Sequence, residues 1–247
     1  MSRILLVSFF VLCGLLVHLN LSAAGGFVDF ETGYTLPGYN DVRIPGDVGT
    51  DFSLSQELKT DTAPFFRLRL GFDINSRHNV SFLYAPLRLS AHGELDRDLD
   101  YNGVTFPGRT PLRATYRFDS YRLTYRYDFL ETGETRFGAG LTAKIRDAAI
   151  GIDGQEFTEK TNTGFVPLIN FNFQWRFNPS WELLIRGDAL AAPQGRAEDV
   201  LSALSYTFND KVRGRFGYRI LEGGADNDEV YNFTLVHYLT AGVTASF

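Results

Sequence analysis

The sequence predicts an all-β fold, a closed antiparallel up-and-down β-barrel of about ten strands, with eight or twelve strands as alternatives. Three observations predict this fold. Apolar and polar residues alternate with a period of two over most of the chain. Aromatic residues, which favour pleated strands, make up 15% of the residues. Long and short connections follow one another between the alternating segments, as they do in a barrel whose hairpins turn at opposite ends.

The first element, residues 1–24, is expected to be a cleaved secretory signal peptide. An arginine precedes an apolar run over residues 4–17, and the small residues Ser22 and Ala24 precede the expected cleavage site. An uncleaved membrane helix is the alternative, but the run is shorter than the ~20 residues that cross a bilayer. The only cysteine, Cys13, lies in this segment. The mature chain is therefore expected to contain no thiol.

The remaining residues, 25–247, are expected to form one barrel domain. In the fourth predicted strand, Leu123 and Tyr125 fall on one face, while Arg122, Thr124 and Arg126 fall on the other. The ten predicted strands are residues 26–36, 64–74, 79–91, 113–129, 135–149, 164–177, 181–191, 199–208, 212–221 and 232–247.

The connections predict which end of the barrel faces outward. Short turns such as Asn75–His78 and Asn178–Ser180 are typical of the periplasmic end. The longer, acidic connections are expected to be extracellular loops near residues 37–63, 92–112, 150–163, 192–198 and 222–231.

The two faces of the strands indicate a membrane rather than water around the barrel. In a soluble barrel the apolar rows would fill the interior, and a belt of exposed aromatic residues would aggregate. In a bilayer the apolar rows face lipid and the charged rows face the lumen. The expected lumen-facing charged network comprises Arg67, Arg69, Asp73, Arg122, Arg126, Asp128, Lys144, Arg176, Glu182, Arg186, Asp188, Arg213, Arg215 and Arg219.

The last predicted strand, "FTLVHYLTAGVTASF", ends on Phe247. This tail resembles those of Gram-negative outer-membrane β-barrel proteins. The resemblance implies that Phe247 is part of the signal read by the barrel assembly machinery. It implies residence in the bacterial outer membrane after export to the periplasm, with outer-membrane lipid and lipopolysaccharide as partners. Ala245 departs from the pattern, because the family usually has a larger apolar residue there.

The expected function is non-enzymatic: a structural role, loop-mediated binding, or passage of small solutes through a narrow, ion-paired lumen. No cofactor is expected. The net charge of −5 argues against nucleic acid as a partner, because such a partner demands a basic excess. One alternative is an outer-membrane hydrolase or lipid-modifying enzyme with His92 or His237 at the outer rim. Another is a soluble periplasmic ligand-binding barrel.

One loop motif suggests a metal site but lacks a required ligand. Residues 98–103, "DLDYNG", match the start of an EF-hand loop, but Arg109 stands where the bidentate glutamate belongs. No metal site is therefore assigned. Asp98, Asp100 and Asn102 are weak candidates for a looser site, with divalent cations held at the acidic loops.

Overall fold

A computed structural model of the chain describes residues 25–193 and 195–247, all in strands, turns and loops. The predicted signal peptide, residues 1–24, lies outside the described residues. Within them, no helix is long and apolar enough to cross a bilayer. The strands are β1 (Gly25–Arg43), β2 (Phe52–Ser53), β3 (Lys59–Thr60), β4 (Pro64–Asp73), β5 (His78–Ala85), β6 (Arg88–Gly93), β7 (Leu99–Tyr101), β8 (Val104–Phe106), β9 (Leu112–Glu131), β10 (Thr135–Asp153), β11 (Phe157–Arg176), β12 (Trp181–Ala192), β13 (Gly195–Asn209), β14 (Val212–Asp226) and β15 (Tyr231–Ser246).

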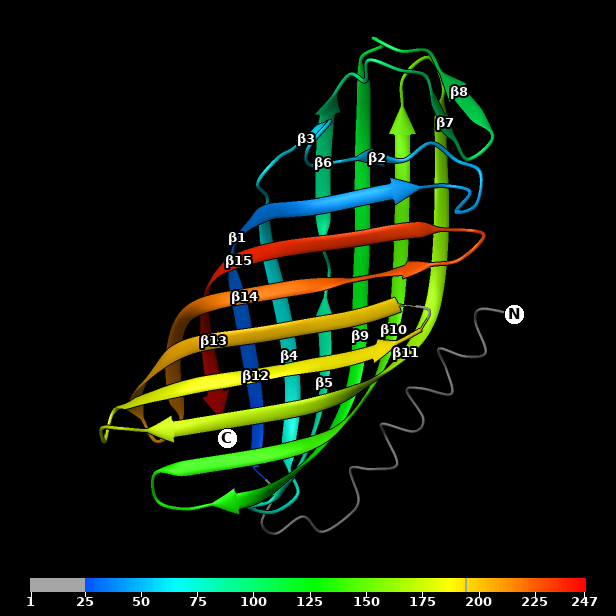
Figure 1. Ribbon diagram of the computed structural model, residues 1–247. Helices are drawn as coiled ribbons and strands as arrows, with labels where there is room; N and C mark the ends of the chain where they lie inside the picture. The colour runs from blue at the N-terminus through cyan, green and yellow to red at the C-terminus, as the bar shows by residue number, and fades with distance from the viewer. Residues whose placement is uncertain (1–24, 194) are drawn as a thin grey trace.

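The wall is a closed antiparallel barrel (Figure 1). Strand β1 pairs with β4 on one side and with β15 on the other, so the first and last strands close the sheet. Strands β5 and β6 form one wall strand, because Ala85 opposite Ser120 and Arg88 opposite Arg117 keep one register across Pro86. Counted this way, the described residues form the ten up-and-down strands that the sequence predicts.

The end that the sequence predicts to be periplasmic, called the periplasmic end below, has tight turns built by asparagine side chains. Asn75, Asn178 and Asn209 each accept hydrogen bonds from backbone amides two or three residues later. Such local bonds are the reason asparagine favours turns. Both ends of the described barrel meet here, because Gly26 and Phe247 exchange two backbone hydrogen bonds of 2.9 Å.

The outer end differs from the sequence prediction in the length of its strands. The predicted loop 150–163 is mostly strand, since β10 continues to Asp153 and β11 begins at Phe157. The predicted loops 192–198 and 222–231 are likewise shortened by β13 and β14, while β1 continues into the predicted loop 37–63. These segments were predicted as loops because they contain many polar residues. Above a bilayer, however, polar residues can occupy the outer face of a strand. Figure 1 shows β9, β10 and β11 extending beyond the ends of β12 and β13.

The lower and middle wall has the sidedness expected in a membrane. Leu123 is 56% exposed on the outer face, whereas its neighbour Arg122 is 1% exposed inside. The exposed apolar belt includes Phe30, Phe66, Leu70, Leu123, Tyr125, Leu141, Ile145, Ile169, Phe216, Leu239 and Val243. A belt of this kind requires lipid around it, so the soluble periplasmic alternative is wrong.

An aromatic girdle lies next to the periplasmic turns. Phe129 packs edge-on against Phe137 at 4.9 Å between ring centroids, and Trp181 packs against Tyr206 at 5.0 Å. Its other members are Phe72, Tyr127, Trp175, Phe177 and Phe208. Amphipathic rings at this height mark the lipid–water interface.

In the outer part of the barrel the apolar residues face inward and the polar residues face outward, the reverse of the arrangement in the lower and middle wall. On β9, Leu112, Ala114 and Tyr116 are buried inside, and Arg113 and Thr115 are exposed. The loops fold inward over this extension and form a core with it, here called the outer cap. Its buried members include Val42, Ile44, Phe52, Leu54, Leu58, Leu89, Leu95, Leu99, Tyr101, Phe106, Leu112, Tyr116, Ile150 and Ile152. The extension therefore behaves like a water-soluble barrel above the membrane.

Candidate functional site

The middle of the lumen is crossed by a buried set of arginines and carboxylates, here called the ion-pair cluster. Asp199 lies at its centre, with Oδ2 at 2.7 Å from Arg67 Nη2 and 2.6 Å from Arg122 Nη2, and it also pairs with Arg219. Arg122 binds Asp188 as well, at 2.7 Å. The buried members are Asp29, Glu31, Arg67, Arg122, Asp188, Asp199, Arg215 and Arg219.

Strand β1 supplies the other half of the carboxylates. Arg219 Nε donates to Glu31 at 2.7 Å, and Arg215 donates to Asp29 at 2.6 and 2.9 Å. Arg215 of β14 can pass over the intervening strand β15 to reach β1 because Gly242 leaves room. A Cβ at that position would lie 2.6 Å from the Arg215 guanidinium carbon.

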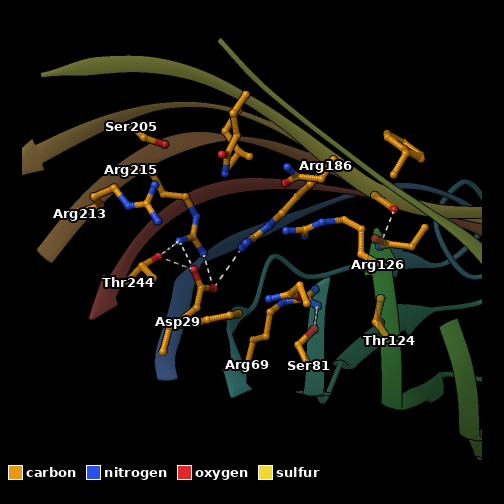
Figure 2. Close-up of a pocket in the computed structure, with 18 of the residues that line it drawn as sticks. Asp29, Arg69, Ser81, Thr124, Arg126, Arg186, Ser205, Arg213, Arg215 and Thr244 are labelled. Atoms are coloured by element: carbon orange, nitrogen blue, oxygen red, sulfur yellow. Dashed lines mark hydrogen bonds and ion pairs between the residues drawn. The ribbon is translucent and has the colours of Figure 1, made fainter. Parts of the chain in front are cut away.

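A narrow cavity runs from this cluster toward the periplasmic mouth (Figure 2). Figure 2 shows Asp29 between Arg215 and Arg186, with Thr244 donating to the same carboxylate at 2.6 Å. The cavity measures about 90 Å³. Because one water needs roughly 10–15 Å³ of such space, the cavity has room for about six to nine waters at most.

A second group of charges lies nearer the periplasmic mouth. Arg126 donates to Asp128 at 2.7 Å, and Arg213 lies 3.5 Å from Glu182. Asp73 accepts a hydrogen bond of 2.8 Å from Asn79. These five predicted lumen residues are therefore in the lumen but outside the central cluster.

The remaining predicted lumen residues divide into two kinds. Arg69 and Lys144 lie in the lumen, and among the described residues neither has a carboxylate within ion-pair distance. Arg69 donates to Ser81 at 3.1 Å, while the Lys144 ammonium lies 4.7 Å from the centre of the Phe118 ring. Arg176, by contrast, is exposed at the end of β11 and lies outside the ion-pair cluster.

Three functional carboxylates were not in the predicted network. Asp29 and Glu31 alternate with the lipid-facing Phe30 in β1, a signal that the sequence carried. Asp199 begins the predicted strand 199–208, directly after the predicted acidic loop 192–198, and the predicted network did not include it. The structure shows that these three residues neutralise most of the central arginines.

Above the cluster the lumen widens into a cavity of about 710 Å³, here called the outer chamber. Phe118, Ile150, Val166 and Leu221 give it apolar walls. Its cations are Lys144, Arg146, Lys160 and Arg196, and its carboxylates are Glu222, Asp228 and Glu229. The ion-pair cluster lies below it, between the chamber and the narrow cavity.

The EF-hand-like motif is a β-hairpin. Asn102 and Gly103 form its two-residue turn between β7 and β8, with φ of 50° and 82°, and Asn-Gly is favoured in such turns. Asp98 accepts from the Gly108 amide at 2.8 Å and Asp100 from Thr105 at 2.6 Å. Within the described residues, no group of three or more His, Cys, Asp or Glu side chains is placed to hold a metal ion.

The three histidines of the barrel lie far apart. His92 Nδ1 is 3.6 Å from Asp61 at the outer rim, and both side chains are more than half exposed. His78 is hydrogen-bonded to Tyr125 at 2.7 Å near the periplasmic turns, and His237 is hydrogen-bonded to Tyr218 on the outer wall.

Solved structures similar to this chain are outer-membrane β-barrels. The outer-membrane protease OmpT from Escherichia coli matches 90% of this chain and 97% of its own, with a TM-score of 0.59 and 10% identity. An outer-membrane channel from Pseudomonas putida F1 matches 91% of this chain and 95% of its own, with a TM-score of 0.42 and 12% identity. The attachment invasion locus protein Ail of Yersinia pestis matches 90% and 99%, with a TM-score of 0.41 and 11% identity.

No protein-family model matches the sequence, and no curated protein matches it. At 10% identity, the similarity to OmpT shows that the two chains share a fold and nothing more. The fold agrees with the apolar belt, the aromatic girdle and the closed ten-stranded wall. The resemblance seen in the C-terminal tail is confirmed: the chain folds as a Gram-negative outer-membrane β-barrel.

Proposed function

We propose that the protein is a non-enzymatic outer-membrane barrel that binds a small ligand in its outer chamber and does not conduct solutes along its axis. The ion-pair cluster is the observation that supports this proposal. Its side chains come from β1, β4, β9, β12, β13 and β14. The ion pairs of Arg67 and Arg122 with Asp199 join distant parts of the wall across the lumen, and those of Arg215 and Arg219 join β14 to β1 over the intervening strand β15.

The cluster blocks conduction for an energetic reason. Opening a path would separate Asp199 from Arg67 and Arg122, or Glu31 from Arg219. Breaking a buried ion pair leaves an uncompensated charge and costs about 3–5 kcal/mol. Several pairs must break together for a pore to open. The chamber above the cluster, at about 710 Å³, falls within the roughly 300–1,000 Å³ that is usual for ligand sites.

Single-channel recording on the refolded protein in a planar bilayer tests the closed lumen. The wild-type protein should give no steady conductance. The double variant E31A/R219A removes one anion and one cation together, so the cluster keeps its charge balance but loses bulk. This variant should give measurable openings. Steady openings of the wild-type protein would contradict the proposal.

The proposal includes two partners in the cell envelope. Outer-membrane lipid, including lipopolysaccharide, would surround the apolar belt, and the barrel assembly machinery would read Phe247, which is 72% exposed. The F247A variant should insert poorly in cells yet refold normally into detergent micelles. Equal insertion of both proteins in cells would remove Phe247 from this role.

A rim hydrolase is the second candidate, and the His92–Asp61 pair favours it. The solved structure with a TM-score of 0.59 is an outer-membrane protease. Incubation of the vesicle-embedded protein with a fluorogenic peptide library tests it. Cleavage that is lost in H92A and retained in H78A would support the enzyme. Absence of cleavage in the wild-type protein would leave the binding role.

A further inference from the structure

The wall opens between β11 and β12 in its outer half. These strands pair only from Ile169 opposite Ala189 to Arg176 opposite Glu182, although β12 continues to Ala192. Residues 157–168 of β11 remain paired with β10 without interruption. By contrast, β14 and β15 pair along their whole lengths. We call this separation the β11–β12 break.

Pro167 lies within the break. Proline has no amide hydrogen, so it cannot donate a ladder hydrogen bond to either neighbour. Continued register would place Pro167 opposite Ala191, and this pair is not formed. Strand pairing between β4 and β5 also stops near Pro86. That gap is filled, because the cavity beside it measures only about 10 Å³ and β3 pairs with β6 above it. Among the described residues, no strand or side chain fills the β11–β12 break in this way.

The break opens into the outer chamber. Val166 and Pro167 of β11 and Leu190 and Ala192 of β12 all line the chamber. Phe165, which is 64% exposed on the outer face, lines it too. The chamber therefore extends through the wall to the outer surface.

The break begins within the lipid belt. Phe165 is opposite Ile145 on β10, and Ile145 is opposite Tyr121 on β9, and all three are exposed apolar residues. Charged residues on the outward-facing positions begin two residues further along these strands, at Asp119, which is covered by Arg88, and at Asp147. Unpaired strand edges are tolerated at membrane depth only where they are buried in protein or line a cavity. This edge lines the chamber, at the height of the outer leaflet.

The chamber has two basic side chains, Lys144 and Arg146, that have no carboxylate partner among the described residues and lie beside its apolar walls. Lys144 is 2% exposed and has no carboxylate partner among the described residues. Arg146 donates to Asn162, and its Nε has no hydrogen-bond partner in the part of the chain that the structure describes. The other two chamber cations are neutralised: Lys160 lies 3.2 Å from Glu229, and Arg196 lies 2.7 Å from Glu222. The third chamber carboxylate is Asp228, at the outer rim.

We propose that the ligand is a single-chain anionic amphiphile, a long-chain carboxylate, which enters the chamber from the outer leaflet through the β11–β12 break. Its headgroup binds Lys144 and Arg146, and its chain lies against Phe118, Ile150 and Leu221. This assignment rests on the proposed ligand-binding function of the chamber. Burial of an unpaired ammonium is costly, and an incoming carboxylate removes that cost.

Binding of pyrenedodecanoate to the full barrel in phosphatidylcholine vesicles tests the ligand class. The double variant K144M/R146Q should bind this carboxylate at least tenfold more weakly than the wild-type protein. The matched control K160Q, which removes a chamber cation already paired with a carboxylate, should change the affinity less than twofold. The methyl ester of the probe should bind weakly to every protein.

The outcomes separate the two proposals. If no protein shows saturable binding of acid or ester, the ligand-binding function fails. If binding saturates but is equal for acid and ester, or is unchanged in K144M/R146Q, the chamber binds ligands and the anionic class is wrong. Displacement of the probe by phosphatidylglycerol vesicles would assign the site to a membrane phospholipid instead.

Entry through the β11–β12 break is tested by the rate at which probe dissolved in the membrane binds to the barrel. V166W fills the break and should slow association at least tenfold. If that variant does not fold, as judged by heat-modifiable gel mobility, A192C labelled after refolding with a bulky maleimide replaces it. The same label on D153C, at the outer turn, is the control. An unchanged rate in the blocked protein would overturn entry through the wall.

Discussion

At the scale of single residues, Asp199 shows how the ion-pair cluster is held together. Its carboxylate contacts three arginines, Arg67, Arg122 and Arg219, and all four side chains are buried. An isolated buried charge would be costly, but these guanidiniums satisfy the carboxylate with charge-assisted hydrogen bonds. The stability of this centre therefore depends on the presence of both signs of charge.

The D199N variant should lose about 3–5 kcal/mol of unfolding free energy, because it leaves three buried arginines with too little negative charge. Urea titration of the protein in lipid vesicles measures the loss. D153N, at the exposed end of β10, changes a carboxylate that has no ion pair with any described residue, so it is the control and should be nearly neutral. A loss below 1 kcal/mol for D199N would mean that solvent or neighbouring groups compensate the arginines.

The sequence predicts individual lumen residues well where each alternates with aromatic neighbours. Arg122 and Arg126 were identified in this way, and both are in the lumen. Periodicity fails at strand ends, where a residue of lumen parity can already be in solvent, as Arg176 is. It also cannot show which partners meet, because Asp29 and Arg215 are separated by 186 positions in the chain.

At the scale of elements, one half of β9 is surrounded by lipid and the other half by water. Below Ser120 its outward residues are apolar, and above it the inward residues are apolar. The apolar residues therefore change from the outward-facing to the inward-facing positions at the height where lipid ends and water begins. This signal is present in the sequence, as "LRATYRF" followed by "YRLTYRY", but a single alternation was assumed for each strand. The predicted loops were too long for the same reason.

The lipid side of β9 predicts a strong asymmetry between neighbouring substitutions. L123R places a charge on the outer face and should cost about 2–4 kcal/mol near mid-bilayer. T124S keeps the buried hydroxyl that bonds Thr142 at 2.8 Å and should be nearly silent. Folding yield into lipid vesicles and unfolding free energy measure both. Equal effects of the two substitutions would show that the face assignment is wrong.

The loops of the outer cap predict an acid-sensitive contact. The hydrogen bond from Arg97 lowers the pKa of Glu57 below its ordinary value of 4.5. The pair is stabilising above that ordinary pKa, and the contribution is lost as the pH falls through the lowered pKa of the folded protein. Because both side chains are partly exposed, the effect should be below about 1 kcal/mol.

Amide hydrogen exchange in residues 50–60 measures this contact. Protection should fall as the pH decreases below 4.5 in the wild-type protein, after correction for the intrinsic exchange rate. In E57Q the protection should be lower at neutral pH and should show no such step. A step that persists in E57Q would assign the acid sensitivity to another group.

At the scale of the whole molecule, the barrel has two parts, the belt and the outer cap, which are stabilised in different ways. The belt is stabilised by lipid outside and ion pairs inside, while the outer cap is stabilised by an apolar core in water. Urea weakens apolar burial in water, and it acts only on surface that becomes exposed to the aqueous phase. The outer cap should therefore unfold at a lower urea concentration than the belt.

The positions of the two tryptophans make this separation measurable. Trp175 and Trp181 both lie in the periplasmic girdle, so tryptophan emission reports on the belt alone. Far-UV circular dichroism reports on all strands, including the outer halves of β9, β10 and β11. In vesicles, part of the dichroism should be lost before the emission changes, since probes of independent units do not coincide. Coincident transitions would mean that the continuous strands couple the outer cap to the belt as one cooperative unit, and the D199N substitution would then destabilise both together.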